Sequence, residues 1–419
     1  MEGFVHPDFA PVTEKVQAIM AKKSARGGMA VAVYHHGELV VDAWTGVRNA
    51  AGDPWERDTM SMSFSTTKGV VATIVQRLVD RGLLDYDVPV ATYWPEFASA
   101  GKDTITLRHL LTHQAGLHDV RSIASSAEDL INWEHMTKLL AEAGPKWDIG
   151  TRSAYHALTY GYLVGEVIRR VTGLTVNEAL QREIVEPLGV SGMYIGAPAA
   201  VRTDIAEQLV DPKAVTRLFK MTKTLAKAKS FQPMYQALVV DDMLDVATTE
   251  RIHDGEIPAA NGVFTARSLA RMYAALATPD DFDGSPLVSP DTLAEATRIQ
   301  TTLGSNGDGR SGEKVGRDAG VGFNMRWRLG YHLVGTTKGV LPEAFGHFGF
   351  GGSGAWGDPE SGLAVAMILN QVGGTPFGAT KMLRIGAAAV RSAERRPEQP
   401  AITPALRPQA WSAGADHIR

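Results

Sequence analysis

The chain has 419 residues, with 42 Lys and Arg against 46 Asp and Glu, a formal net charge of −4 and no cysteine. Hydrophobic residues make up 44% and charged residues 21%, which is typical of a globular protein of roughly two to three domains. The absence of cysteine excludes disulfides, thiolate chemistry and Cys-based metal sites, and the balanced charge favours neither a nucleic acid nor a membrane surface as a partner.

The first predicted elements are a helix and a hairpin. Residues 11–25 are predicted to form a surface helix, and β-rich runs at residues 29–34 and 38–44 predict two antiparallel strands. His35 and His36 fall in the turn between these strands. A metal site is one interpretation of the pair, but histidines at a hairpin turn are more typical of solvent-exposed residues, so we predict no metal site.

The segment Ser65-Thr66-Thr67-Lys68 opens a predicted helix that stops at Gly82. Ser65 and Lys68 share one face at this spacing, with Cβ atoms roughly 5–6 Å apart, so the amine can reach the hydroxyl. Burial and the positive end of the helix dipole both favour a neutral lysine, which could take the proton of Ser65. The same spacing recurs at residues 311–314 in a polar, glycine-rich stretch, which we interpret as a chance match.

Residues 83–200 are mostly helical by pattern. One helix is predicted over residues 107–117, and its His109 and His113 are candidates either for a catalytic base or for hydrogen bonds that shape a loop beside the pocket. A loop at residues 144–151 precedes Tyr155. Further helices are predicted at residues 160–171 and 176–184, at residues 268–276 and from residue 288 onward.

Residues 200–260 carry the weakest pattern. Their basic positions between residues 213 and 229 are interpreted as a solvated helix face. From its place in the chain, we expect this segment, together with Asn261, to shape the specificity of the site.

The last third returns to strands. Alternating or apolar runs predict strands at residues 323–329, 345–349, 353–357 and 363–370, followed by a helix at residues 379–395. The order of strands, helices and strands predicts an α/β (α+β) fold, in which one antiparallel sheet is built from both chain termini and a mostly helical part is inserted. The predicted domains are residues 1–85 plus 300–395, residues 86–299, and a tail at residues 396–419, with the active site at the domain interface.

Five segments in this order resemble the serine β-lactamase-like superfamily, which includes class C β-lactamases, D-alanyl-D-alanine carboxypeptidases and family VIII carboxylesterases. The resemblance covers roughly residues 25–390, and the ordered set is more specific than any single motif. The segments are Ser65-Thr66-Thr67-Lys68, Leu110-Leu111-Thr112-His113-Gln114-Ala115-Gly116-Leu117, Ser153-Ala154-Tyr155-His156-Ala157-Leu158-Thr159-Tyr160-Gly161, Glu186-Pro187-Leu188-Gly189 and Gly346-His347-Phe348-Gly349.

The resemblance implies roles for the matching residues. Ser65 would attack the substrate carbonyl and form an acyl-enzyme, and Lys68 would deprotonate it or hold the charge of the site. Tyr155 would share the task of general base and protonate the leaving group, which requires a neighbouring cation because its ordinary pKa is ~10. The backbone N–H groups of Ser65 and Phe350 would form the oxyanion hole.

The same match implies a set of substrate-binding positions on the strand that edges the site and beside the catalytic tyrosine. They are His347, Phe348, Gly349, His156 and Ala157. Two of them depart from the β-lactamase pattern, since Ala157 stands in the place of an asparagine that binds the β-lactam amide and His347 in the place of a lysine. Both departures make the chain more similar to family VIII carboxylesterases.

The sequence therefore predicts a serine hydrolase that cleaves carboxylic esters, with short acyl chains as the simplest substrates. An amide- or peptide-directed member of the fold (a weak β-lactamase, a D-aminopeptidase or an acyltransferase) is the alternative, and an inactive binding homologue is a further one. No serine lies in Gly-x-Ser-x-Gly, which argues against an α/β-hydrolase, and no metal or nucleotide motif predicts a cofactor.

We expect a small-molecule ester as partner, with no nucleic acid and no membrane, and the oligomeric state is left open. The N-terminus has no signal-peptide pattern and no segment approaches the ~20 apolar residues of a membrane span, so a cytoplasmic location is expected.

Overall fold

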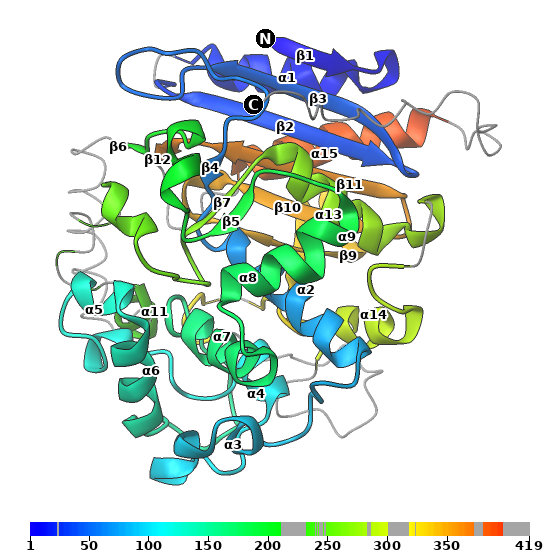
Figure 1. The fold of residues 1–419 in the computed structure, drawn as a ribbon. Helices are drawn as coiled ribbons and strands as arrows, with labels where there is room; N and C mark the ends of the chain where they lie inside the picture. Colours follow the sequence, from blue (N-terminus) through cyan, green and yellow to red (C-terminus); the bar gives the residue numbers. More distant parts are fainter. Residues whose placement is uncertain are drawn as a thin grey trace, which may run out of the picture.

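A seven-stranded antiparallel sheet with the order β1-β3-β2-β11-β10-β9-β8 forms the centre of the molecule (Figure 1). The computed structural model describes residues 1–22, 25–210, 232–238, 240, 242, 246, 249–282, 286–300, 318–322, 324–372 and 380–396. The strands are β1 (Glu2–Val5), β2 (Gly28–His35), β3 (Glu38–Gly46), β8 (His332–Thr336), β9 (Gly339–Phe348), β10 (Gly354–Asp358) and β11 (Leu363–Leu369). Because strands from both ends of the chain pair in one sheet, the predicted fold class is confirmed.

The two central strands are buried on both faces. In β2, Val31 and Val33 belong to one hydrophobic core, and Ala32 between them belongs to the other. In β11, Val365 and Ala366 divide between the two cores in the same way. Side chains alternate across a strand, so each strand contributes to two cores at once. The antiparallel register places Ala32 opposite Ala366.

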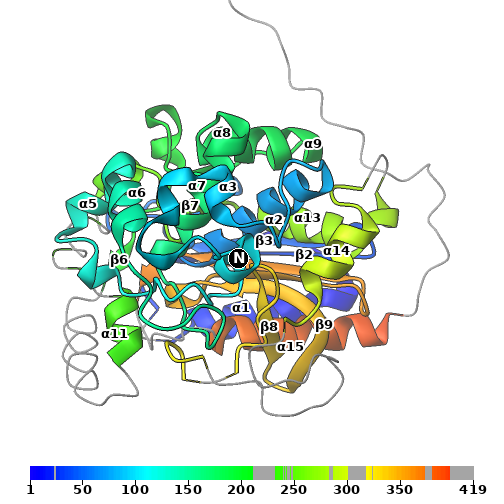
Figure 2. The ribbon, with the colours of Figure 1, turned by 90° about the horizontal axis from the view of Figure 1, so that it is seen from below.

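Helices cover both faces of the sheet (Figure 2). On one face, α1 (Ala10–Met20) and α15 (Thr380–Arg395) pack on each other and on the strands. On the other face lie α13 (Ala266–Ala277), which contacts β2, β10 and β11, and α2 (Thr66–Asp80), which contacts β9. The second face is the one that carries Ser65.

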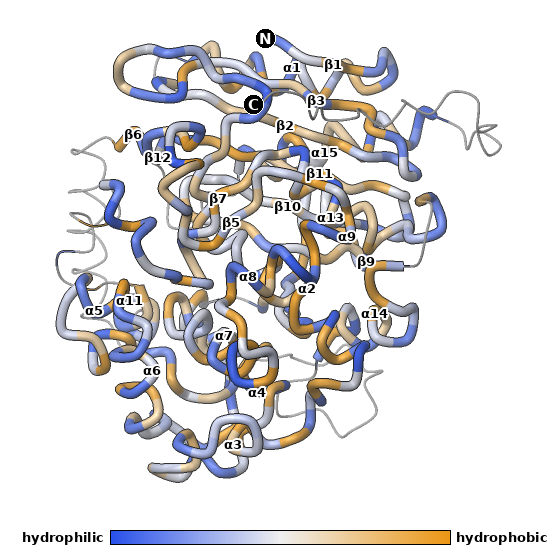
Figure 3. The backbone as a smooth tube through the Cα atoms, viewed as in Figure 1, coloured by the Kyte–Doolittle hydropathy of each residue, from blue (hydrophilic) through white to orange (hydrophobic). Residues whose placement is uncertain are grey.

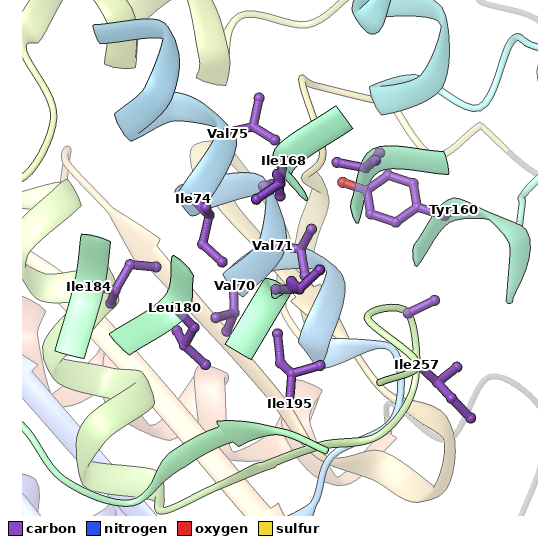
Figure 4. Packing of buried hydrophobic residues seen from close by; sticks show 14 of the residues in the cluster. Val70, Val71, Ile74, Val75, Tyr160, Ile168, Leu180, Ile184, Ile195 and Ile257 are labelled. Atoms are coloured by element: carbon purple, nitrogen blue, oxygen red, sulfur yellow. The ribbon is translucent and has the colours of Figure 1, made fainter. Parts of the chain in front are cut away.

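The helical part of the chain surrounds α2. Val70, Val71, Ile74 and Val75 of α2 are fully buried, and Figure 4 shows them among side chains of α7, α8 and η4. Hydrophobic segments accordingly run through both the sheet and the helical part (Figure 3). The helices here are α3 (Val90–Tyr93), α4 (Leu107–Leu111), α5 (Ala127–Ile131), α6 (Trp133–Glu142), α7 (Thr159–Thr172), α8 (Val176–Leu180), the π-helix η4 (Gln181–Val185), α9 (Glu186–Leu188), α11 (Gln232–Leu238) and α14 (Pro290–Thr297).

Two smaller sheets complete the fold. A three-stranded sheet with the order β4-β7-β5 pairs β4 (Ser61–Met62), β7 (Gly262–Phe264) and β5 (Met193–Ile195). A parallel pair joins β6 (Leu209–Val210) to β12 (Gln371–Val372). The three-stranded sheet matters for the site because β4 runs directly into the turn before α2, and Ser63 N donates to Gly262 O over 2.9 Å.

Three local predictions are wrong. Residues 324–328 form no strand, and β8 begins only at His332. The helix predicted over residues 107–117 ends at Leu111, because His113 has φ 60°, a conformation that breaks a right-handed helix. His35, expected to be exposed, is only 7% exposed and packs its ring against Phe9.

Several other expectations stay predictions. The second Ser-x-x-Lys match at residues 311–314, the basic positions 213–229 and the tail beyond residue 396 lie outside the described residues. The division into domains at residues 85 and 299 stays a prediction; α13 lies within the predicted helical domain yet packs on the sheet. Across the described part of the chain, no helix combines the length and apolar character needed to cross a membrane.

Candidate active site

Ser65 lies at the turn that starts α2, and it is partly exposed. The preceding residue, Phe64, has φ 46°, an unusual conformation for a residue with a bulky side chain. Thr67 stabilises this turn, since its hydroxyl donates to Phe64 O over 2.6 Å and accepts from Gly262 N over 3.0 Å. Backbone strain of this kind clusters at functional sites, and here it directly precedes the predicted nucleophile.

Lys68 is fully buried one turn into α2, and its Nζ lies 3.2 Å from Ser65 Oγ. The same nitrogen donates to Ala157 O over 2.7 Å and to Ala259 O over 2.9 Å. Among the described residues no carboxylate forms an ion pair with Lys68, and burial lowers its pKa well below 10.5. The two carbonyls accept hydrogen bonds from two N–H groups of the amine. The third side of the nitrogen, which in a neutral amine carries the lone pair, faces the hydroxyl of Ser65.

Tyr155 stands beside this pair in a setting of aromatic rings. Lys68 Nζ lies 4.8 Å from the centre of its ring, and Trp327 stacks on the ring at 5.7 Å with an interplanar angle of 7°. His113 meets the ring edge-on at 4.9 Å. Burial raises the pKa of Tyr155 above its ordinary value of 10, while a hydrogen bond with Ser65 acts in the opposite direction. The phenol therefore keeps its proton near neutral pH.

The end of β9 approaches the serine turn closely. A Cβ on Gly349 would lie 2.2 Å from Ser63 O and 3.0 Å from Thr66 Oγ1, so only glycine fits here. The next residue, Phe350, brings its ring within 5.6 Å of the Phe64 ring. Within the described part of the chain, the backbone N–H groups of Ser65 and Phe350 have no acceptor. An oxyanion hole requires two such N–H donors, and here one comes from the turn before α2 and the other from the residue after Gly349.

His347 occupies the site as a neutral ring. It is 2% exposed, and its Nδ1 lies 3.1 Å from Phe348 O, so Nδ1 carries the proton and Nε2 is an acceptor. Nε2 has no hydrogen-bond partner among the described residues, and the ring lies 6.2 Å from that of Tyr155. Burial lowers the pKa of His347, so no cation stands at this position.

Three predicted substrate-binding side chains are not available to a substrate. Phe348 packs in the core on the α1 and α15 side, because side chains alternate along β9 and its neighbour His347 faces the other way. His156 is fully buried, with Nδ1 bonded to Ala154 O and Nε2 accepting from Leu117 N. Neither side chain therefore lies where it could contact a substrate directly, and the assignment of the two residues to substrate binding stays a prediction.

Asn261 is the third. Its amide nitrogen donates to Ile252 O and Gly255 O, and its oxygen accepts from Ile257 N. The side chain is thus used up in shaping its own loop, the loop that presents Ala259 O to Lys68. Ala157, in contrast, contributes through its backbone carbonyl, and its buried methyl group offers a substrate no hydrogen bond.

The two histidines of the segment 107–117 form hydrogen bonds that shape the backbone, which was the alternative to a role as catalytic base. His109 caps α4, with Nδ1 accepting from Thr106 N over 3.1 Å. His113 accepts from His156 N over 3.2 Å, and its own carbonyl accepts from Ala154 N. His113 therefore shapes the segment around Tyr155, and His109 the start of α4.

Asp318 and Trp327 are site residues that sequence reasoning missed. Asp318 is 1% exposed, accepts from Tyr155 N over 3.0 Å, and accepts from Trp327 Nε1 over 3.0 Å. The local signal was the Asp-Ala-Gly sequence that begins at residue 318, which is typical of a turn closed by an aspartate side chain. Within the described part of the chain, no group of three or more His, Asp or Glu residues could hold a metal ion.

Comparisons with known proteins give matches over most of the chain. A family profile described as beta-lactamase matches residues 12–389. The chain is 37% identical over 373 residues to the esterase/beta-lactamase LipL of Mycobacterium tuberculosis, which covers 88% of this chain and 83% of that protein. A solved family VIII carboxylesterase has a TM-score of 0.77 at 33% identity, covering 93% of this chain and 99% of its own. A penicillin-binding protein homologue from Caulobacter crescentus has a TM-score of 0.76 at 31% identity, covering 93% and 99%.

Proposed function

This chain belongs to the beta-lactamase family, and we propose that it is a serine hydrolase that cleaves carboxylic esters through an acyl-enzyme on Ser65. The observation that carries the proposal is the environment of Lys68. This buried amine has no ion pair among the described residues, is held by two carbonyls and lies 3.2 Å from a serine hydroxyl, which is the arrangement of a base.

In acylation, Lys68 Nζ takes the proton of Ser65 Oγ as the oxygen attacks the ester carbonyl. The negative charge that develops on the carbonyl oxygen is stabilised by the N–H groups of Ser65 and Phe350. The carbon–oxygen bond of the ester then breaks, and the Tyr155 hydroxyl gives its proton to the departing alkoxide. The raised pKa of Tyr155 and the lowered pKa of Lys68 both favour this assignment, with lysine as base and tyrosine as acid.

Deacylation reverses these proton movements. After the alcohol leaves, Tyr155 is a phenolate beside the protonated Lys68, whose Nζ lies 4.8 Å from its ring. The phenolate takes a proton from a water molecule, which attacks the acyl carbonyl. When the carbon–oxygen bond to Ser65 breaks, Lys68 returns its proton to the serine and the free enzyme is restored.

The preference for esters over β-lactams has two supports in the site. Ala157 offers no side-chain amide to a β-lactam, and His347 offers a neutral imidazole where a lysine would offer a cation to a substrate carboxylate. Among the relatives, a family VIII carboxylesterase and the esterase EstB of Burkholderia gladioli, 31% identical over 203 residues, support the same substrate class. Short acyl groups are the first substrates to test.

A second candidate is β-lactam hydrolysis as a weaker activity. It is supported by the similarity to a protein described as both an esterase and a beta-lactamase. The same acyl-enzyme chemistry would open a β-lactam ring, since the ring amide carbonyl is attacked as the ester carbonyl is.

The test compares hydrolysis of p-nitrophenyl butyrate with that of a chromogenic cephalosporin, across a series of esters of graded acyl length. Ser65→Ala is expected to abolish ester turnover. Ser361→Ala is the matched control, because it removes a hydroxyl in the turn between β10 and β11 that donates to Asp358 over 2.6 Å. Full turnover by Ser65→Ala would overturn the proposal, and no turnover of any substrate by the wild-type chain would favour an inactive binding homologue.

A further inference from the structure

We propose that Asp318 is the positioning residue of the general acid: its carboxylate fixes both the backbone and the ring of Tyr155, so that the phenol reaches the leaving oxygen. This inference rests on the proposed function, because it assigns Asp318 a task in the step that Tyr155 performs. The carboxylate makes no contact with Ser65 or Lys68 among its hydrogen bonds, so it acts through Tyr155.

Asp318 is a buried carboxylate whose partners are neutral N–H groups. One oxygen accepts from the backbone of Tyr155 over 3.0 Å, Gly320 over 2.8 Å and Val321 over 3.0 Å. The other accepts from Trp327 Nε1 over 3.0 Å. No Lys or Arg forms an ion pair with it in the described residues. Burying a charge without a counter-ion is costly, so this carboxylate depends on all four donors.

Two of the four donors lead to Tyr155. The first is the tyrosine's own backbone N–H. The second is the indole N–H of Trp327, whose ring lies parallel to the tyrosine ring at 5.7 Å. One carboxylate therefore fixes the main chain of Tyr155 and, through the indole, the plane of its phenol ring.

The loop that carries Asp318 is packed closely against the segment that carries Tyr155. Ala319 N donates to Ser153 O over 2.9 Å. A Cβ on Gly320 would lie 3.0 Å from Tyr155 N and 3.2 Å from Tyr155 Cβ, so the contact leaves little room for a side chain. A rigid contact of this kind is what a catalytic group needs, since a misplacement of about 1 Å can cost on the order of 10²-fold in rate.

The charge of Asp318 also acts on the proton of Tyr155. After burial, which is the larger cause, the Asp318 charge helps to raise the pKa of the phenol. A phenol that holds its proton until the leaving oxygen develops charge is suited to act as an acid. Among the described residues, the titratable groups that face Tyr155 are Lys68 from α2, His113 from the loop after α4, Tyr160 from α7, His347 from β9, and Asp318.

The test uses two butyrate esters that differ in their need for a proton. Ethoxide must be protonated as it leaves, whereas p-nitrophenolate is stable without a proton. In Asp318→Asn, the new amide faces the indole N–H as donor against donor, and the negative charge is gone. We expect kcat/KM for ethyl butyrate to fall on the order of 10²-fold, and kcat/KM for p-nitrophenyl butyrate to fall less than about tenfold.

The alkaline side of the pH profile gives a second readout. Loss of the Asp318 charge lowers the pKa of Tyr155, so the fall of kcat/KM for ethyl butyrate at high pH should begin at lower pH in Asp318→Asn than in the wild type. If Asp318 had a purely structural role, Asp318→Asn would lower kcat/KM for both esters equally, and the fall of kcat/KM at high pH would begin at the same pH as in the wild type. That result would overturn the proposal.

Two further variants keep the test decisive if Asp318→Asn folds poorly. Trp327→Phe keeps an aromatic ring for stacking but removes the N–H that Asp318 accepts, and it should show the same selective loss on ethyl butyrate. Asp358→Asn is the control for a buried aspartate, since Asp358 is 3% exposed at the end of β10. An equal selective loss in Asp358→Asn would contradict the proposal.

A double variant separates this inference from the proposed function. In a Tyr155→Phe background there is no acid left to position, so Asp318→Asn should cause no further selective loss on ethyl butyrate. If Tyr155→Phe keeps full activity, the proposed function of Tyr155 fails. If Tyr155→Phe loses activity but Asp318→Asn does not, only the role of Asp318 fails.

Discussion

At the scale of single residues, Gly349 decides how closely β9 approaches the nucleophile. A Cβ at this position would lie 2.2 Å from Ser63 O, a backbone atom that cannot rotate away. The absence of a side chain at Gly349 therefore lets the Phe350 N–H lie beside the turn of Ser65, and a site built around two free N–H donors depends on it.

Gly349→Ala should separate the strand from this turn and weaken the oxyanion hole. Loss of one such donor costs about 10²–10³ in kcat, so we expect a fall of that order for ester hydrolysis. Gly335→Ala in β8 is the control, because its nearest neighbour outside the adjacent residues would lie 3.8 Å from the new Cβ. Steady-state kinetics of both variants decide the matter; equal activities would mean that the Phe350 N–H is not used.

The lowered pKa of Lys68 fixes the sign of the pH dependence. Burial holds the pKa of Lys68 well below 10.5, and only the neutral amine can take the proton of Ser65. We therefore expect kcat/KM for ester hydrolysis to rise with pH through this lowered pKa and to stay level until Tyr155 loses its proton above pH 10. A profile measured from pH 4 to 11 checks this, and an acidic limb that rises only near pH 10 would contradict a neutral lysine.

The sequence predicts those site residues whose type and spacing indicate a chemical role. The spacing of Ser65 and Lys68 indicates a nucleophile with its base, and the structure places their side chains 3.2 Å apart. The patterns do not tell which polar atoms are already satisfied, so His156 and Asn261 were assigned to the substrate although their hydrogen bonds stay inside the protein. Asp318 was missed because its four donors come together only in three dimensions.

At the scale of elements, irregular backbone explains where pattern reading fails. Residues 324–328 alternate as a strand does, yet Asp318 holds Trp327 by its indole, and the backbone continues to Gly330 at φ 85° without a strand partner. Three long helices follow the prediction: α7, α13 and α15 differ from the predicted ranges by at most two residues at either end. Long apolar periodicity is the strongest local signal, and these three helices carry it.

The far end of α2 depends on one buried carboxylate. Glu183 of η4 is 1% exposed and contacts Arg81 at 2.5 Å, Arg182 at 3.0 Å and Arg77 at 3.7 Å. Arg77 and Arg81 belong to the end of α2 opposite Ser65. The ion pairs thus join the helix of the nucleophile to the helical part of the molecule.

Glu183→Gln should destabilise the protein without changing its chemistry. The arginines that remain are 20–45% exposed and can be solvated, so the loss is that of hydrogen bonds to one buried charged acceptor, about 1–3 kcal/mol, and we expect a fall in Tm with normal ester kinetics at 25 °C. Glu96→Gln is the matched control, because Glu96 is 61% exposed in its pair with Arg170, and exposed pairs contribute about 0–1 kcal/mol. Thermal unfolding of the two variants gives the comparison, and equal Tm values would refute this role of Glu183.

At the scale of the whole molecule, buried histidines make stability depend on pH. Burial lowers the pKa of His332 to about 4 and that of His156 to about 3, and it lowers the pKa of His113 and His347 as well. Between these values and 6.5 the unfolded chain binds protons that the folded protein does not bind. Stability therefore rises with pH in this window and is lost as pH falls below 6.5.

We expect Tm to fall as pH is lowered from 6.5 toward 4, with each such histidine contributing up to about 1.4 kcal/mol per pH unit. His156→Gln should flatten this dependence, since a glutamine does not titrate. Thermal unfolding at a series of pH values checks the slope. A Tm that stays constant from pH 6.5 to 4 would show that the four rings are not held neutral by the fold.

The order of strands has a consequence for how the chain is made. β2 pairs on one side with β3, its neighbour in sequence, and on the other with β11, more than 300 positions later: Ala32 lies opposite Ala366. During synthesis the hairpin of β2 and β3 therefore emerges with one edge of the apolar strand β2 unpaired. That edge stays unpaired until β11 has left the ribosome. An unpaired edge of this kind can pair with strands of other molecules. The nascent chain must therefore avoid aggregation at the free edge of β2 until β11 is available to pair with it.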